Sequence, residues 1–191
     1  MTLERPGRRQ EREFLELVGR SRALHGPWVT PPRTKAGYAS LLRRSRRRSC
    51  EAFFVRASET GELAGAVWIT EIVRGVFRSG YLSYHGFAPT AGRGLMGAGL
   101  AAVIRKAFRD LGLHRLEANI RPGNRDSIRL VRRLGFRREG FSPRYLRLGG
   151  CWRDHERWAI LAEEFRAGRG GRARPKLRRP RFVPSSDKGE S

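Results

Sequence analysis

The stretch best suited to chemistry is TAGRGLMGAG, residues 90–99. It holds four glycines in ten residues, with Arg93 between Gly92 and Gly94, and a helix-like pattern follows directly. Because glycine has no Cβ, its backbone can approach a ligand closely, and free amides at a helix start attract phosphate. The stretch lacks the GxxxxGK(S/T) pattern of nucleotide hydrolases and the GxGxxG layout of dinucleotide binders. Two interpretations stay open: a phosphate-binding loop of another class, or a tight turn.

A strand and a helix must position this loop. Residues 80–87 (GYLSYHGF) are typical of a strand, and apolar steps of three and four over 96–111 predict an amphipathic helix that Gly112 ends. Further strands are expected over 52–56, 63–70, 114–120, 144–148 and 152–161, the last two joined by a hairpin at Gly149-Gly150. Helices are expected over 8–22 and 37–48, and a short one starts at Asn124 or Asp126. This order predicts an α/β (α+β) fold with a mixed, mostly antiparallel sheet flanked by helices.

The charge of the chain is extreme. Its 191 residues include 41 basic and 18 acidic side chains, for a net charge of +23. Such a surface suits a polyanionic partner such as RNA, or an anionic cofactor, or is only generally adhesive. Residues 166–191 carry nine basic and two acidic residues and few apolar ones. We therefore expect a single domain over 1–165 and a basic, disordered tail over 166–191.

Other features bear on the compartment and on metals. Cys50 and Cys151 lie far apart without metal-ligand spacing, so neither a disulfide framework nor a metal site is expected. The N-terminus lacks the apolar stretch of a signal peptide, and no run reaches the roughly 18 apolar residues of a membrane span. The sequence predicts a cytoplasmic protein without a membrane partner.

The loop and the residues after it resemble the GNAT acetyltransferases, which use acetyl-coenzyme A (acetyl-CoA). The stretches AGRGLM, LGLHRLEANIRPGNRDSIRLVRRLGFRREGF and RYLRLGGCWRDHERWAI are similar to the RimJ/RimL type of ribosomal-protein N-terminal acetyltransferase. The resemblance is dense over about residues 80–161 and looser back to residue 8. In the family loop, Q/R-x-x-G-x-G/A, the glycine at the fourth place is Gly94, whereas Ala91 and Met96 depart from the pattern at the first and sixth places.

The resemblance implies a set of cofactor contacts. The amides of Gly92, Arg93, Gly94 and Leu95 would surround the pyrophosphate of acetyl-CoA. The end of the strand, from Gly86 through Phe87 to Ala88, would pair with the pantetheine amides. The backbone near Phe87 would also polarise the thioester. Asn124 would contact the cofactor, cap a helix, or do both.

The resemblance is less informative about catalytic groups. Ser127 would lie near the thioester sulfur and protonate the leaving thiolate, or else serve as another cap residue. Many relatives use a tyrosine seven residues after the position of Asn124, where this chain has Val131. Some place a carboxylate before the tyrosine that matches Tyr145, where this chain has Arg144.

The remaining candidates for the general base are His85, Glu71 and Glu117, chosen by strand position, although a lone strand histidine is more often structural. The WRDH string, Trp152 to His155, is interpreted as structural, with Trp152 and Trp158 at core-like places.

Three functions follow from these considerations. The first is transfer of acetyl from acetyl-CoA to the N-terminal amine of a protein with Ala or Ser at its start, a ribosomal protein by resemblance, with RNA contact through the basic segments. The second keeps the chemistry with a small amine or amino acid as acceptor. The third is a non-catalytic RNA-binding assembly factor. The chain would act as a monomer or a homodimer.

Overall fold

Seven strands form one mixed sheet in the computed structural model, which describes residues 1–167. The strands are β1 (Thr2–Glu4), β2 (Glu51–Arg56), β3 (Leu63–Val73), β4 (Ser79–Gly86), β5 (Arg115–Ile120), β6 (Arg137–Leu148) and β7 (Cys151–Leu161). Their order is β1-β2-β3-β4-β5-β7-β6, and within the described residues every neighbouring pair is antiparallel except β4 and β5. The expected mixed, mostly antiparallel sheet is confirmed.

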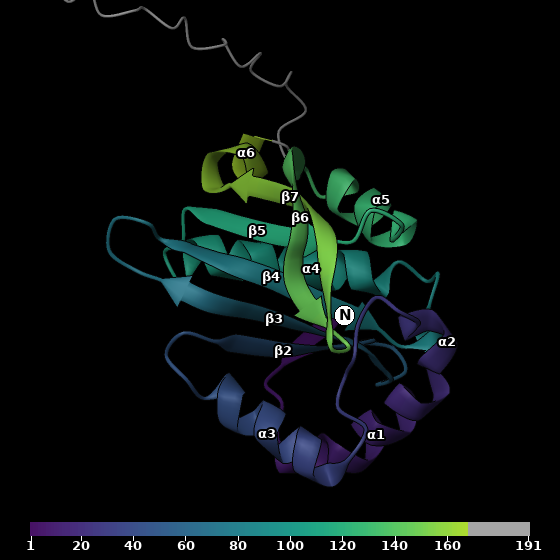
Figure 1. The fold of residues 1–191 in the computed structure, drawn as a ribbon. Helices are drawn as coiled ribbons and strands as arrows, with labels where there is room; N and C mark the ends of the chain where they lie inside the picture. Colours follow the sequence, from purple (N-terminus) through teal and green to yellow (C-terminus); the bar gives the residue numbers. More distant parts are fainter. Residues whose placement is uncertain (168–191) are drawn as a thin grey trace, which may run out of the picture.

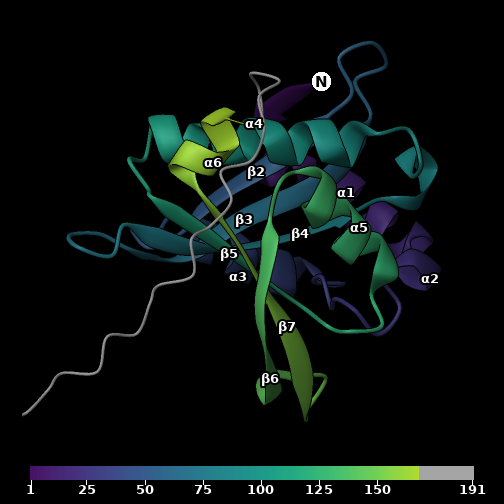
Figure 2. The ribbon, with the colours of Figure 1, turned by 90° about the horizontal axis from the view of Figure 1, so that it is seen from above.

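Helices cover both faces of this sheet (Figures 1 and 2). They are η1 (Arg8–Gln10), α1 (Glu11–Arg20), α2 (Arg22–His25), α3 (Lys35–Ser45), η2 (Ala88–Thr90), α4 (Leu95–Arg109), α5 (Arg125–Arg133) and α6 (Ala162–Ala167). On β2, Phe53 and Val55 belong to the core shared with α4 and α5, whereas the neighbouring Phe54 belongs to the core shared with α1 and α3. Alternation along each central strand therefore supplies both cores.

The close approach of α4 to the sheet depends on a glycine. A Cβ on Gly99 would lie 2.5 Å from a methyl carbon of Val55. The absence of a side chain at this position lets the helix lie directly on β2.

The C-terminal hairpin differs from the expectation. Strand β6 begins at Arg137 rather than at residue 144, and irregular pairing between Arg138 and Gly140 and between Ser142 and Leu146 accommodates Gly140 and Pro143. Such bulges let a strand continue past residues that usually interrupt it. The hairpin of β6 and β7 projects beyond the rest of the sheet (Figure 2).

This projection corrects one expectation about the core. Trp158 is buried as expected, but Trp152 lies on the projecting part and is 60% exposed.

Three features at the ends of the chain complete the fold. Strand β1 and helix α6 had not been expected. The basic tail expected over 166–191 lies outside the described residues, apart from the two that end α6. No helix in residues 1–167 combines the length and the apolar character that crossing a membrane requires.

Candidate active site

The central strands β4 and β5 diverge and leave part of β4 unpaired. The two strands pair only from Ser79 to Tyr81, opposite Arg115 to Glu117. Beyond that point β4 continues against β3 as far as Gly86, while β5 continues against β7. The amide of Phe87 donates to Ala64 O at 2.9 Å, on the side of β3. Because alternate residues of an antiparallel ladder face the partner, the polar main-chain groups of Tyr84 and Gly86 face the opening.

The loop after β4 carries a row of unused amide donors. Gly92 and Gly94 adopt left-handed φ angles of +77° and +76°, which favour glycine. The first amide bonded inside α4 is that of Ala98, which donates to Gly94 O at 3.1 Å. Within residues 1–167, the successive amides from Gly92 to Gly97 donate no hydrogen bond. Together with the dipole of the 15-residue helix α4, these donors form a site for an anion.

The two departures from the family loop have different outcomes. Met96, at the sixth place, packs over Gly65 and Gly86, and a Cβ on Gly65 would overlap its sulfur. The missing side chains of β3 and β4 thus make room for the larger loop residue. Nothing in the structure explains Ala91.

Arg93 does not point freely into solvent. Its guanidinium bonds a carboxylate oxygen of Glu62 at 2.8 Å and so links the loop to the β2–β3 turn.

Asn124 and Ser127 lie at the start of α5. The Asn124 side-chain oxygen accepts from the Ser127 amide at 3.2 Å, which is the capping role. The Ser127 hydroxyl has no hydrogen-bond partner in the part of the chain that the structure describes.

Tyr84 on β4 is an additional site residue. Its hydroxyl donates to the Ser127 carbonyl at 3.4 Å, and burial raises the pKa of Tyr84 to about 12. Tyr84 therefore joins β4 to the first turn of α5. The sequence reasoning missed it, because strand alternation alone does not tell which face meets α5.

Within residues 1–167, the main-chain polar groups of Gly86 to Ala88 are already engaged, except for the amide of Gly86. The Gly86 carbonyl lies 2.9 Å from His25 Nε2, and the Ala88 amide donates to the Ser21 hydroxyl at 2.9 Å. The Phe87 amide bonds β3, and the Phe87 carbonyl accepts from the Thr90 amide at 3.2 Å. Phe87 and Ala88 therefore have no free main-chain amide for the expected pairing with a ligand, whereas the main chain of Tyr84 and the amide of Gly86 face the opening.

His85 lies in an aromatic cage on the other face. Its ring stacks on Trp68 with centroids 5.2 Å apart and contacts His25 at 5.0 Å and Phe87 at 5.4 Å. Burial, followed by the nearby His25, lowers the pKa of His85 to about 3. The imidazole stays neutral near pH 7 and accepts a proton poorly, which favours a structural role.

The two candidate carboxylates lie away from the loop. Glu71 is exposed, with φ +48°, where β3 loses register with β4 near the far end of β4. Glu117 accepts from Arg115 Nε at 2.8 Å.

A line of side chains on the His85 face leads from β4 to a small pocket. Burial, followed by a hydrogen bond with Tyr145, raises the pKa of Tyr81. The ring of Tyr145 lies 6.3 Å from that of His155. Arg121 beyond it lies over the Trp28 ring at 5.3 Å. The pocket, of about 160 Å³, is lined by Pro27, Trp28, Val29, Thr30, Arg121, Leu148, Gly149 and Arg153.

The WRDH residues have structural partners. The Asp154 carboxylate accepts from the Arg144 amide at 2.7 Å, where Arg144 has φ +46°. His155 Nδ1 lies 2.9 Å from the Arg153 carbonyl. Residues 1–167 contain no group of three or more His, Cys, Asp or Glu side chains that could hold a metal ion.

Comparison with known proteins gives matches over most of the chain. Residues 1–137 match the family model described as an acetyltransferase (GNAT) domain. The ribosomal protein uS5-alanine N-acetyltransferase of Escherichia coli K12 is 39% identical over 108 residues, which cover 56% of each chain. The matched region thus spans little more than half the length of this curated relative.

Solved structures agree with the fold. Mycobacterium smegmatis RimJ, in complex with CoA-disulfide, has a TM-score of 0.77 and 28% identity and covers 85% of this chain and 82% of its own. Spermidine N-acetyltransferase of Vibrio cholerae, with CoA and spermine, has a TM-score of 0.73 and covers 86% and 96%. Its 20% identity bears on the fold alone.

Proposed function

The chain belongs to the GNAT acetyltransferase family. We propose that it transfers acetyl from acetyl-CoA to the N-terminal α-amine of a ribosomal protein. The observation that carries the proposal is the row of amides from Gly92 to Gly97, which donate no hydrogen bond in the described part of the chain and come directly after the strand that diverges from β5.

The residues present fit the coenzyme. The amides of Gly92, Arg93, Gly94 and Leu95 would bind the diphosphate, because charge-assisted bonds from a helix start are favourable. The main-chain groups of Tyr84 and the amide of Gly86 would pair with the pantetheine amides as an added strand does. The M. smegmatis relative was solved with a CoA derivative, which supports the same ligand class here.

The proposed reaction is direct attack of the neutral amine. The nitrogen bonds the thioester carbon, the carbon–sulfur bond breaks, and the sulfur leaves with the electron pair. The Ser127 hydroxyl, which has no hydrogen-bond partner within residues 1–167, would protonate that sulfur. Water would receive the proton lost by the amine and would return one to the serine oxygen. Because an α-amine titrates near pH 8, a buried strong base is not required, which agrees with the low pKa of His85.

The names of relatives and the charge near the site support a protein acceptor. The E. coli relative is named for alanine N-acetylation of ribosomal protein uS5. A small amine is the second candidate, because spermidine acetyltransferases share the fold. The pocket beside Trp28 carries Arg121 and Arg153 and no carboxylate among its lining residues. A polycation would be repelled there, so the pocket favours a peptide over a polyamine.

A thiol-release assay tests the proposal. The full chain is incubated with acetyl-CoA and, in separate reactions, with peptides that start with Ala or Ser, the same peptides blocked at the α-amine, and spermidine. Release with the free peptides alone is the expected result. Release with spermidine alone would favour the small-amine enzyme. RNA binding without any CoA binding would favour the non-catalytic assembly factor.

A further inference from the structure

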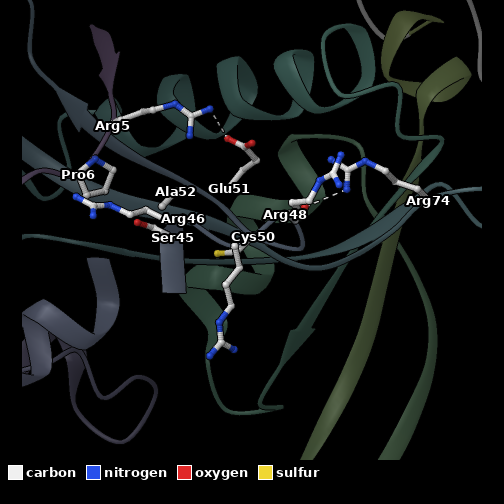
Figure 3. Close-up of a pocket in the computed structure, with 10 residues that line it drawn as sticks. Arg5, Pro6, Ser45, Arg46, Arg48, Cys50, Glu51, Ala52 and Arg74 are labelled. Carbon is white, nitrogen blue, oxygen red and sulfur yellow. Dashed lines mark hydrogen bonds and ion pairs between the residues drawn. The ribbon is translucent and has the colours of Figure 1, made fainter. Parts of the chain in front are cut away.

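A second cavity lies at the end of the sheet opposite the glycine loop. Its volume is about 480 Å³, and it is lined by Arg5, Pro6, Ser45, Arg46, Arg47, Arg48, Cys50, Glu51, Ala52 and Arg74 (Figure 3). The cavity lies beside the start of β2 and the end of β3, whereas the glycine loop follows the end of β4 (Figure 1). From Gly65 to Val73, β3 spans about 26 Å at roughly 3.3 Å per residue. Both regions can therefore be occupied at once.

The cavity is strongly cationic. Five of its lining residues are arginines and one is an acid, and that acid, Glu51, is paired with Arg5 at 2.7 Å. Arg46, Arg47 and Arg48 are exposed, and none of them pairs with a carboxylate in residues 1–167. Positive charge therefore exceeds negative charge by a wide margin at this place.

The arginines stand on a segment with a defined main chain. The Cys50 amide donates to Arg47 O, and the Ile72 amide donates to Ser49 O, both at 3.0 Å. Arg74 reaches from the β3–β4 hairpin to the Arg48 carbonyl at 3.0 Å, as Figure 3 shows. These bonds fix the main chain between α3 and β2 and hold the Arg74 guanidinium against it, so that arginines from two separate segments line one cavity.

The hairpin that supplies Arg74 also exposes apolar side chains. Between Val73 and Ser79, which pair with each other, Val76 is 96% exposed and Phe77 is 71% exposed. Phe77 lies three residues after Arg74 on this hairpin. An exposed aromatic ring on the same hairpin as a cavity-lining arginine suits the two contacts that single-stranded nucleic acid offers, which are stacked bases and phosphates. A duplex keeps its bases stacked inside and would leave the Phe77 ring without this partner.

We propose that the cavity formed by Arg46, Arg47, Arg48 and Arg74, together with Phe77, is a binding surface for single-stranded nucleic acid. The arginines bind consecutive phosphates, and Phe77 stacks on an unpaired base. The surface is separate from the proposed catalytic residues and would hold the enzyme near a nucleic-acid-rich acceptor such as a ribosome.

Fluorescence anisotropy with labelled 12-mers of uridylate and thymidylate tests the surface on the full chain. The variant R46Q/R47Q/R48Q should bind about 50-fold more weakly at 0.15 M salt, and its log–log salt slope should be smaller by about 2, because each phosphate contact on a single strand contributes about 0.7. Phe77→Ala should weaken binding by about 5- to 100-fold.

The matched control is R20Q/R22Q/R33Q, which removes the same charge from exposed arginines that also lack a carboxylate partner in residues 1–167. It should retain most of the affinity. An equal loss in both triple variants, an unchanged affinity of Phe77→Ala, or equal competition by a polyglutamate peptide of the same charge would each overturn the proposal. CoA affinity, measured in parallel, reports that every variant is folded.

Discussion

Replacing Gly94 by alanine should weaken CoA binding far more than it weakens the fold. A non-glycine residue in the left-handed region costs about 1–2 kcal/mol, and Gly94 has φ +76°. A Cβ at this position meets no atom within 4 Å in the free protein, so the conformational cost is the whole effect on stability. In a domain of this size that cost lowers Tm by about 2–8 °C.

The effect on the ligand is larger, because the new methyl group and the altered φ both act where the diphosphate would bind. Hydrogen bonds to charged groups contribute about 1.5–3 kcal/mol each. Loss of two of them, about 3 kcal/mol, corresponds to a rise of roughly 100-fold in the Kd for CoA. Isothermal titration calorimetry measures this Kd directly, and the KM for acetyl-CoA should follow it.

Gly75→Ala provides the matched control. Gly75 has φ +69°, also has open space around its Cβ position, and lies on the β3–β4 hairpin away from the loop. Its variant should lose the same stability and keep the wild-type Kd. If the two variants lose equal stability and both keep that Kd, the diphosphate does not bind at Gly94 and the reasoning fails.

Three further predictions concern catalysis, pH and packing. Ser127→Ala should lower kcat by about 100-fold with little change in the Kd for CoA, if its hydroxyl protonates the thiolate; an unchanged kcat in stopped-flow thiol release would remove it from the mechanism. The His85 pKa, lowered to about 3, implies stability that is complete above about pH 6.5 and declines below it, by about 2 kcal/mol at pH 5. Urea titrations should show a smaller decline for His85→Gln, and equal slopes would refute this. Gly99→Ala should cost about 1–3 kcal/mol, because its Cβ would lie 2.5 Å from Val55. Gly19→Ala, at an exposed position of α1, should stabilise by about 0.5–1 kcal/mol in the same thermal scans.

Local patterns were sufficient for most elements of the fold. Strand alternation and the three-and-four spacing of apolar residues predicted β4, α4 and β5 to within two residues. The glycine pair with Arg93 correctly indicated a loop that opens a helix, and the left-handed φ angles at Gly92 and Gly94 explain why glycine occupies both places. These features depend on residues adjacent in the chain.

The remaining features depend on contacts between residues distant in the sequence. Ser21 and His25 engage the end of β4 from more than sixty residues away, so the sequence could not indicate that Ala88 lacks a free amide. Trp152 is of a residue type expected in a core, but it lies on the part of the β6–β7 hairpin that projects beyond the sheet and is exposed. Strand alternation identifies two faces, and only the packing of α5 shows that Tyr84 lies on the face that meets this helix.

The fit of Met96 into the space above Gly65 and Gly86 has a consequence for protein engineering. The side chain of Met96 fills the space that side chains at the two glycine positions would otherwise occupy. Restoring the small residue usual at the sixth loop place would therefore leave a void beneath the N-terminus of α4, unless a strand glycine is replaced by a larger residue. Met96→Ala alone should weaken the packing of the start of α4 against β3 and β4, and Met96→Ala with Gly86→Ala should recover part of that packing. A motif comparison that scores each letter separately would miss this exchange between the loop and the strands.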